Sequence, residues 1–482
     1  MALTHRGLSQ RSVGAADLMT FGISASCPMA VIAGAVVATF AATGVVAVSP
    51  SFLVLGAALA LFAVGFLAIS RDVSNAASFY AFLARSLGPA AGLAGAAVSL
   101  LSYNAVQVAL YGLIGSILAG TVGGAWWIWA FAAWLAVAVI GVLHIGVNTR
   151  VLGVILIAEL AVILLFDLTG LLDPAAGHVD AAPLLPTSLL QSGGLGGVLA
   201  FGIASFIGVE SIVVYREEVD GHRSVALACY GTIAFLSVFY AISSWALASA
   251  VGSDKIVDTA RDPAANLPFG ILGDRYGEIA GLFGQVLLVT GLFAALLSFH
   301  QVVARYVYSL ARESILPADL GLLGGAKGGV PIAGSVVQTV VAAIGLALFA
   351  ISGTDPIAVL FTWLSELAAL GILMLMVFTS IGVVRYYRVR GEGLGFSRGV
   401  APICSAIVLA AVLVISILNM DSITPEAPTL RWILPGLLLL VAVAGAWVAQ
   451  RLRVRNPVVY AGIGWGEPPA LAVPEPLADL EL

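Results

Sequence analysis

The sequence predicts an all-α integral membrane protein with twelve transmembrane helices. Of its 482 residues, 61% are hydrophobic and only 10% are charged. The mean hydropathy is +1.07. A soluble protein of this composition could not cover its surface with polar groups, so we expect the lipid bilayer to be its solvent.

Twelve apolar segments are long enough to cross a membrane, which takes roughly 20 mainly apolar residues in a helix. They lie near residues 17–45, 50–69, 89–118, 126–143, 151–172, 194–214, 225–251, 278–308, 331–352, 357–384, 401–418 and 433–449. An even number of spans places both termini on the same side of the membrane.

Basic residues in the short loops orient these spans, because Lys and Arg gather on the cytoplasmic side. With the N-terminus inside, only Lys255, Arg261, Arg275 and Arg431 of the 21 Lys and Arg residues fall outside. We therefore expect a multi-pass plasma membrane protein with both termini in the cytoplasm. The excess of Arg over Lys suggests a bacterial source.

The first and sixth spans each contain a cluster of helix-breaking residues at mid-length. Residues 21–28 read Phe-Gly-Ile-Ser-Ala-Ser-Cys-Pro, and residues 201–210 read Phe-Gly-Ile-Ala-Ser-Phe-Ile-Gly-Val-Glu. Backbone groups in hydrocarbon need internal partners, so such breaks are tolerated where they line a cavity. Breaks in corresponding positions predict a 5+5 inverted repeat with the binding site at the interrupted midpoints. Either break alone could be a simple packing kink.

The repeat divides the chain into five parts. We expect an N-terminal cytoplasmic tail at residues 1–16, a first five-helix repeat at 17–172 and a second at 194–386. Two additional C-terminal helices, 11 and 12, follow at 399–450, and a C-terminal cytoplasmic tail at 451–482.

Broken helices expose dipole ends and unpaired backbone groups inside the membrane. The half-helix that begins near Pro28 turns its positive N-terminus toward the midplane, where the amides of residues 27–30 could bind a carboxylate. Carbonyl groups near residues 22–25 and 204–207 could bind an ammonium group. An α-amino acid zwitterion fits these two poles. The candidate substrate-binding residues at the breaks are Gly22, Ile23, Ser24, Ala25, Ser26, Cys27, Pro28, Ala204, Ser205, Phe206, Ile207 and Gly208.

The twelve spans and two breaks resemble those of the amino acid, polyamine and organocation (APC) transporter superfamily, amino acid permease branch. Two motifs carry the resemblance, SFIGVES at residues 205–211 and the segment 304–317 from Ala-Arg to Ala-Arg-Glu-Ser-Ile-Leu-Pro. The resemblance covers roughly residues 17–449. It implies an inverted-repeat fold, alternating access, and a site between spans 1, 3, 6, 8 and 10.

The sequence departs from the family pattern at several of these positions. Span 1 has Gly-Ile-Ser-Ala-Ser-Cys-Pro where many relatives have Gly-Ser-Gly-Ile, so the substrate's identity is not carried over. Ala204 stands where arginine-exchanging relatives have an aromatic residue, which argues against that exchange cycle. None of the three cysteines, Cys27, Cys229 and Cys404, is expected outside the cell, so we expect no disulfide-linked heavy chain.

Ionisable residues within membrane spans are costly and are therefore functional candidates. Glu210 in span 6 could exchange a proton near the substrate, as the resemblance implies, or could merely complement the positive end of a helix. Glu159 in span 5 is the second candidate for proton coupling. The resemblance implies this, because several relatives carry at this position a Lys that replaces a bound sodium ion, which favours a proton site over a sodium site. A structural hydrogen bond is the alternative. Glu366 and His300 are further intramembrane candidates, and His300 is favoured as a packing residue.

Three other polar residues could join the substrate site. They are Tyr103 and Asn104 in span 3 and Ser298 in span 8, although helix-to-helix hydrogen bonding is the commoner use of such side chains. Phe206 could cap the substrate as a gate or simply pack. We expect the charged run at residues 216–223 to form a solvated loop whose ion pairs contribute little.

These features predict a secondary active transporter, not an enzyme, that moves an amino acid by alternating access, with proton symport as the leading mechanism. An importer of a polyamine or other organic cation and an amino acid exchanger remain alternatives, since three buried acids could balance a dication. Expected partners are the small-molecule substrate, protons and the lipid bilayer. No ATP-binding motif occurs, and we expect no cofactor, metal ion or nucleic acid.

Overall fold

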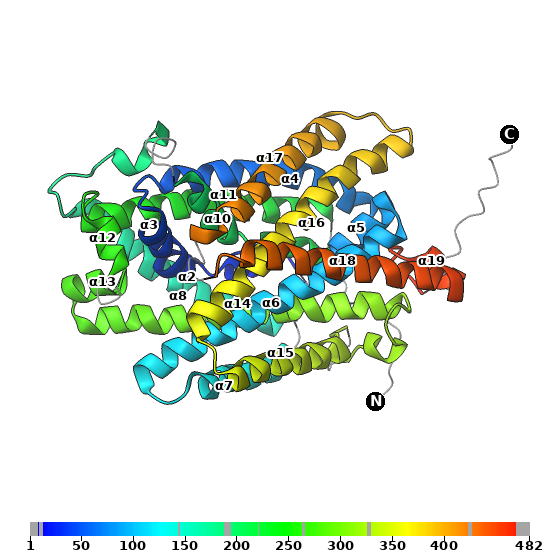
Figure 1. Ribbon diagram of the computed structural model, residues 1–482, viewed down its shortest axis with the longest axis horizontal. Coiled ribbons are helices and arrows are strands. Elements are labelled where there is room, and N and C mark those ends of the chain that lie inside the picture. Colours follow the sequence, from blue (N-terminus) through cyan, green and yellow to red (C-terminus); the bar gives the residue numbers. More distant parts are fainter. Residues whose placement is uncertain are drawn as a thin grey trace.

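The computed structural model describes residues 8, 13–142, 145–187, 194–219, 221–262, 266–324, 329–422 and 427–468. All regular elements in these ranges are helices. The long helices run side by side along the longest axis of the molecule (Figure 1). Two short helices, α5 (Ser78–Leu87) and α19 (Pro457–Gly462), lie at one end of this bundle. Two others, α12 (Ile256–Arg261) and α13 (Phe269–Tyr276), lie at the opposite end.

Ten long helices form most of the bundle. They are α4 (Ser49–Asp72), α6 (Pro89–Val122), α7 (Trp126–Gly141), α8 (Ile145–Leu172), α11 (His222–Val251), α14 (Glu278–Arg312), α15 (Ile332–Ser352), α16 (Thr362–Val389), α17 (Ala401–Leu418) and α18 (Leu430–Arg455). The π-helical turns η6 (Pro356–Phe361) and η7 (Phe396–Val400) lead into α16 and α17. Short 3-10 helices η2 (Ala182–Leu184), η5 (Ala318–Gly321) and η8 (Met420–Ser422) lie in the connections.

Two spans are built from several shorter pieces. Span 1 consists of α1 (Ala15–Ser26), α2 (Pro28–Ala30), the π-helical turn η1 (Val31–Val36) and α3 (Val37–Thr43). Span 6 consists of α10 (Leu195–Ala204) and the 3-10 helix η3 (Val209–Glu218). These are the two spans in which the sequence predicts a break.

Eleven helices in the described residues are long and apolar enough to cross a membrane, so the chain is a multi-pass membrane protein. The expected fourth span, α7, is the exception because it has 16 residues. At 1.5 Å per residue it is about 24 Å long, which is less than the roughly 30 Å thickness of a bilayer's hydrocarbon core. The end of that expected span, Leu143, lies outside the described residues.

The connection between α4 and α6 contains a helix that the apolar pattern did not predict. Helix α5 ends at Leu87, and the next residue, Gly88, has a φ of 108°, which side chains strongly disfavour. Pro89 then occupies the first position of α6, where its missing N–H costs nothing. The Gly-Pro pair therefore makes the sharp turn from α5 into the third span.

Span 6 lies at the centre of the bundle and the last two helices lie at its edge. In its most apolar stretch, the span Leu195–Glu218 is 83% buried, whereas α18 is 22% buried. Large apolar side chains on α18, such as Leu440 and Val443, are exposed. Such side chains would face lipid tails.

Helices at corresponding positions of the two expected repeats pack against each other. Contacts join α1 to η3, α4 to α11, α6 to α14, and α7 to α15. These are spans 1 and 6, 2 and 7, 3 and 8, and 4 and 9.

Residues near both ends of the chain meet at one end of the bundle. Leu8 packs with Ala76 and Tyr308, and the Gly464 amide donates to the Glu313 carboxyl group nearby.

Candidate substrate site

The first break lies at Cys27, in the middle of span 1. The φ of Cys27 is 47°, in the left-handed region, and its amide donates to the Ser24 carbonyl at 3.1 Å, which ends α1. Pro28 has no N–H to donate and begins α2. The π-helical turn η1 follows directly, so the regular pattern of helical hydrogen bonds is interrupted at two neighbouring places.

The second break lies at Ser205–Gly208 in span 6. The amides of Ser205, Phe206 and Ile207 donate to carbonyls three residues earlier, and Gly208 has a φ of 109°. The ten-residue 3-10 helix η3 follows. Runs of 3-10 helix beyond three or four residues are uncommon, and in mid-helix they often mark a hinge or strain.

The two breaks touch each other. The Ser26 hydroxyl lies 3.3 Å from the Ile207 carbonyl oxygen, to which it donates across the two spans. A methyl group at Gly208 would lie 2.6 Å from Ala25 Cβ, so only glycine permits both this approach and the positive φ. On the far side of the breaks, the Phe21 ring stacks on Tyr215 at 4.6 Å between centroids.

Glu159 reaches the first break from helix α8. Its side chain is 1% exposed, and Oε1 accepts the Met29 amide at 2.5 Å. Gly291 on α14 leaves room for this carboxyl group, because a methyl group there would lie 2.8 Å from Oε2. Of the amides expected to be open to a substrate, that of Met29 is therefore taken by Glu159 and that of Cys27 by the Ser24 carbonyl.

Glu210 occupies the equivalent place at the second break. Its Oε2 accepts the Gly208 amide at 2.9 Å, and Oε1 accepts the Tyr103 hydroxyl of α6 at 3.1 Å. Glu210 thus complements the positive end of η3, the structural role considered from the sequence. No Lys, Arg or His of the described ranges lies within ion-pair distance of Glu159 or Glu210.

The remaining candidates at the breaks divide into packed and unpartnered side chains. Phe206 is buried against Phe52 and Tyr240, with ring centroids 6.3 Å and 5.9 Å away. The Ser24 hydroxyl and the Asn104 Oδ1 are buried without a hydrogen-bond partner in the described residues. These two oxygens have hydrogen-bonding capacity that a ligand could use.

Other polar candidates bond within their own helix or pack locally. The Ser205 and Ser298 hydroxyls donate to the carbonyls of Phe201 and Ala294, four residues earlier. The methyl group that Gly22 lacks would lie 2.6 Å from Ile212 Cδ1, so Gly22 permits α1 to pack on η3.

His300 and Glu366 lie apart from the contacts at the breaks. His300 Nε2 is 2.6 Å from the Ser335 hydroxyl, and its ring packs against Gly141. This is the arrangement of a packing histidine. Glu366 is 5% exposed and makes no hydrogen bond or ion pair to the described residues. Nor do the described residues contain three His, Cys, Asp or Glu side chains grouped to hold a metal ion.

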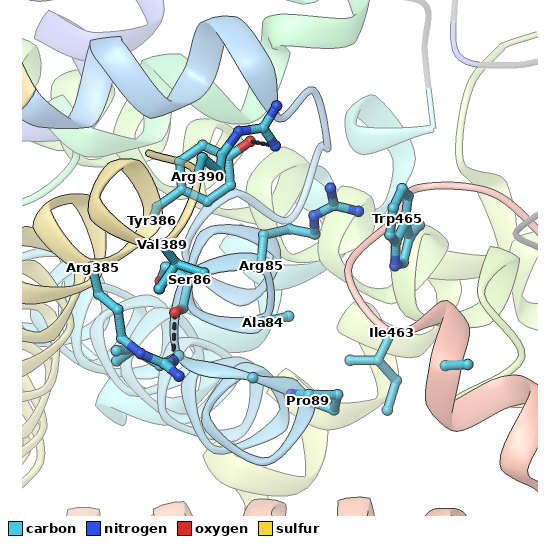
Figure 2. A pocket seen from close by; sticks show the side chains of 13 residues that line it. Ala84, Arg85, Ser86, Pro89, Arg385, Tyr386, Val389, Arg390, Ile463 and Trp465 are labelled. Carbon is cyan, nitrogen blue, oxygen red and sulfur yellow. Dashed lines mark hydrogen bonds between the residues drawn. The ribbon is translucent and has the colours of Figure 1, made fainter. Parts of the chain in front are cut away.

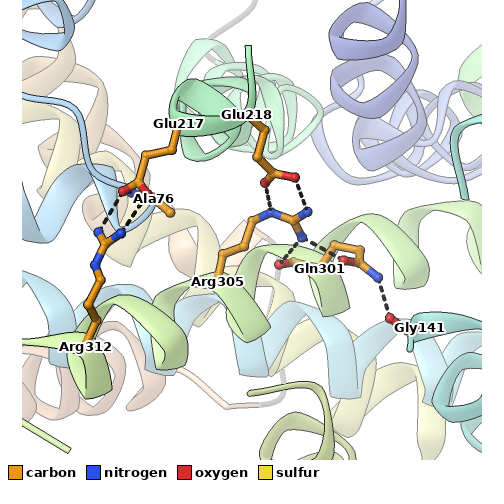
Figure 3. A network of polar contacts seen from close by, with 7 residues as sticks. All are labelled: Ala76, Gly141, Glu217, Glu218, Gln301, Arg305 and Arg312. Carbon is orange, nitrogen blue, oxygen red and sulfur yellow. Dashed lines mark hydrogen bonds and ion pairs between the residues drawn. The ribbon is translucent and has the colours of Figure 1, made fainter. Parts of the chain in front are cut away.

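A buried polar network joins the end of span 6 to span 8 (Figure 3). Arg305 on α14 donates to both carboxylate oxygens of Glu218, with Nε 2.6 Å from Oε1, and both side chains are at most 2% exposed. Arg305 also donates to Gln301, whose amide donates to the Gly141 carbonyl. The guanidinium lies 4.5 Å from the Tyr215 ring centroid.

A second pair extends this network toward α5. Arg312 makes two hydrogen bonds of 2.8 Å with Glu217, whose Oε1 also accepts the Ala76 amide at 2.9 Å. The prediction of a solvated loop was therefore wrong for Glu217 and Glu218, which belong to η3 and face α14. The sequence did contain a signal, since Arg305 and Arg312 belong to the motif at residues 304–317.

The fold and site define a class of protein. Interrupted helices that meet inside a membrane bundle are typical of secondary transporters. A family model described as amino acid permease matches residues 17–466. The chain therefore belongs to the amino acid permease family of the APC superfamily, a family of transporters rather than enzymes. No individually curated protein matches it.

Proposed function

We propose that this protein carries an amino acid across the plasma membrane by alternating access, in symport with protons. The proposal rests on the contact between the two breaks and on the glutamate that accepts a backbone hydrogen bond at each of them. Glu159 accepts the Met29 amide, and Glu210 accepts the Gly208 amide. The contacts between corresponding helices support the further proposal that spans 1–5 and 6–10 are inverted repeats.

The two glutamates suggest how proton and substrate binding are coupled. A substrate carboxylate would seek the positive N-terminal ends of α2 and η3, where Glu159 and Glu210 now lie. Two carboxylates cannot share one amide without repulsion, and no basic side chain in the described ranges neutralises either glutamate. Protonation removes the charge of the glutamate and weakens its hold on the amide, so a proton favours binding of the substrate carboxylate.

The substrate's ammonium group would lie at the opposite poles. Helices α1 and α10 both end at the breaks, and the C-terminal ends of helices carry partial negative charge. The unpartnered oxygens of Ser24 and Asn104 are additional acceptors for an ammonium group. The candidate substrate-binding residues therefore remain those of the two breaks, with Tyr103 holding Glu210 and Asn104 facing the ligand.

The Arg305–Glu218 pair is the proposed inner gate. It fixes η3 to α14 on the side of the breaks that the distribution of basic residues assigns to the cytoplasm. Because both side chains are buried, a path to the cytoplasm cannot open along this contact until the pair separates. The structure is accordingly assigned to a state that is closed toward the cytoplasm.

Uptake of labelled substrates into proteoliposomes tests the proposal. A panel of amino acids and polyamines is compared with and without an inward proton gradient, for wild type, Glu159→Gln and Glu210→Gln. We expect the gradient to drive accumulation of an amino acid in wild type and not in either variant. The matched control is Glu278→Gln, which changes an exposed acid at the start of α14 and should leave accumulation intact.

The outcomes separate the alternatives. Gradient-driven uptake of a polyamine, with no competition by amino acids, would identify an organic-cation importer. Uptake that requires internal amino acid and ignores the gradient would identify an exchanger. Unchanged gradient-driven accumulation in both glutamate variants would contradict their role as proton carriers.

A further inference from the structure

A basic pocket lies where the third span begins and the tenth span ends. It shares no lining residue with the two breaks. It has a volume of about 450 Å³ and is formed by the end of α5, the start of α6, the end of α16 and the segment after α19. Three arginines, Arg85, Arg385 and Arg390, and two aromatic residues, Tyr386 and Trp465, line it (Figure 2).

Neutral groups orient all three arginines, and Arg390 in addition pairs with Glu392. The Arg85 guanidinium stacks on the Trp465 ring at 3.3 Å from its centroid. Arg385 donates to the Ser86 carbonyl at 2.7 Å, and Arg390 donates to the Tyr386 hydroxyl at 3.1 Å. Stacking and bonding to carbonyl or hydroxyl groups orient a guanidinium while leaving its charge uncompensated.

None of the described residues that line the pocket is acidic, and Asp72, Glu313 and Glu392 interact with its arginines from outside the lining. Within the described ranges, neither Arg85 nor Arg385 forms an ion pair. Glu392 is shared between Arg390 and Arg398. Glu313 forms no direct pair with the arginines that line the pocket, because its oxygens accept hydrogen bonds from Asn75, Tyr80 and the amides of Gly464 and Gly466. Burial lowers the pKa of Arg85; Tyr386 and Glu313 oppose this shift, whereas repulsion from Arg390 adds to it.

The remaining walls also suit an anion at the membrane surface. The 34-residue helix α6 begins at Pro89 on the pocket wall, so its positive end faces the same space. Val389, another lining residue, is 75% exposed at the end of a membrane-spanning helix, which is where lipid would lie. Basic pockets between spans at this level suit phosphate headgroups.

We propose that this pocket binds a phosphate-bearing anion, with the three arginines as its ligands. An anionic phospholipid headgroup and free phosphate offer the same chemistry, and the exposed Val389 favours the lipid. An anion bound here would join α5 and α16 to the segment around Trp465. The site is separate from the proposed substrate site and does not depend on its function.

The test measures binding to the purified full-length protein in detergent. Short-chain phosphatidylglycerol, short-chain phosphatidylcholine and inorganic phosphate are each titrated, with thermal unfolding and native mass spectrometry as readouts. We expect phosphatidylglycerol to bind at least about tenfold more tightly than phosphatidylcholine, because charge-assisted bonds to the arginines are strong. Binding of inorganic phosphate with equal affinity would support the site and assign it to free phosphate.

Variants locate the binding. Arg85→Gln and the exposed Arg390→Gln should each weaken phosphatidylglycerol binding, and the combination should abolish its preference over phosphatidylcholine. The control is Arg453→Gln with Arg455→Gln, which removes exposed charges at the end of α18 outside the pocket and should leave the affinity within about twofold. Equal binding of both lipids by wild type, or unchanged preference in Arg390→Gln, would overturn the proposal.

Discussion

Replacing Gly208 by Ala tests whether contact between the two breaks matters for transport. The new methyl group would lie 2.6 Å from Ala25 Cβ and 3.1 Å from the Ala25 carbonyl carbon. Favourable carbon contacts lie at about 3.5–4.0 Å, so spans 1 and 6 would have to separate. Overpacking of this kind costs about 1–3 kcal/mol. The φ of 109° adds a backbone cost of about 1–2 kcal/mol for alanine.

Gly353→Ala supplies the matched control. Gly353 ends α15 with a φ of 66°, in the same left-handed region as Gly208, but no atom of the described residues lies within 4 Å of the position of its added methyl group. This variant therefore bears a left-handed backbone cost without the clash. The difference between the two variants, about 1–3 kcal/mol, corresponds to a roughly 5- to 150-fold lower population of the state in which the breaks touch.

Initial rates of uptake into proteoliposomes and thermal unfolding in detergent measure this difference. We expect Gly208→Ala to lower both the uptake rate and the unfolding temperature well below those of Gly353→Ala. Equal values for the two variants would refute the reasoning, because the clash would then have no effect on folding or transport.

Two further substitutions test neighbouring contacts. Gly291→Ala should displace the Glu159 carboxyl group from the Met29 amide and so reduce proton-driven accumulation. The control is Gly436→Ala, whose added methyl group meets no atom of the described residues within 4 Å and should leave accumulation unchanged. Equal accumulation by both variants would contradict the role of this contact. Glu218→Gln should lower the free energy of unfolding by about 3–5 kcal/mol, because it leaves Arg305 buried without a counterion. Glu392→Gln removes two surface pairs, each worth about 0–1 kcal/mol, so similar denaturation midpoints for these two variants would show that the buried pair is not stabilising.

Much of the fold could be predicted from the sequence because lipid imposes simple requirements. Apolar length locates the spans. Pro28 and Gly208 locate the two breaks, because Pro28 cannot donate a helical hydrogen bond and Gly208 permits a positive φ. Helix α5 was not predicted, because its ten residues are too few to span a membrane, although eight of them are buried in the protein. The apolar run of the fourth span predicted a full-length helix, but α7 has only 16 residues, so an apolar run does not by itself fix the length of the helix.

The contacts of the site were harder to predict. Glu159 and Met29 are 130 positions apart, so only the packing of α8 against span 1 reveals that this carboxyl group takes the amide expected to bind substrate. Glu217 and Glu218 read as a solvated run because charged residues near a span end are usually exposed. Their partners, Arg312 and Arg305, lie about two spans further along the chain, in the last turns of α14, and sequence spacing gives no distance between them.

Proton uptake on substrate binding tests the central idea most directly. Once the uptake panel has identified a transported amino acid, it is added to wild-type protein in weakly buffered detergent solution containing a pH indicator. We predict that binding takes up protons, because the substrate carboxylate displaces glutamates that must then be protonated, and that Glu159→Gln takes up fewer. Saturating binding to wild type without any change in pH would contradict the account.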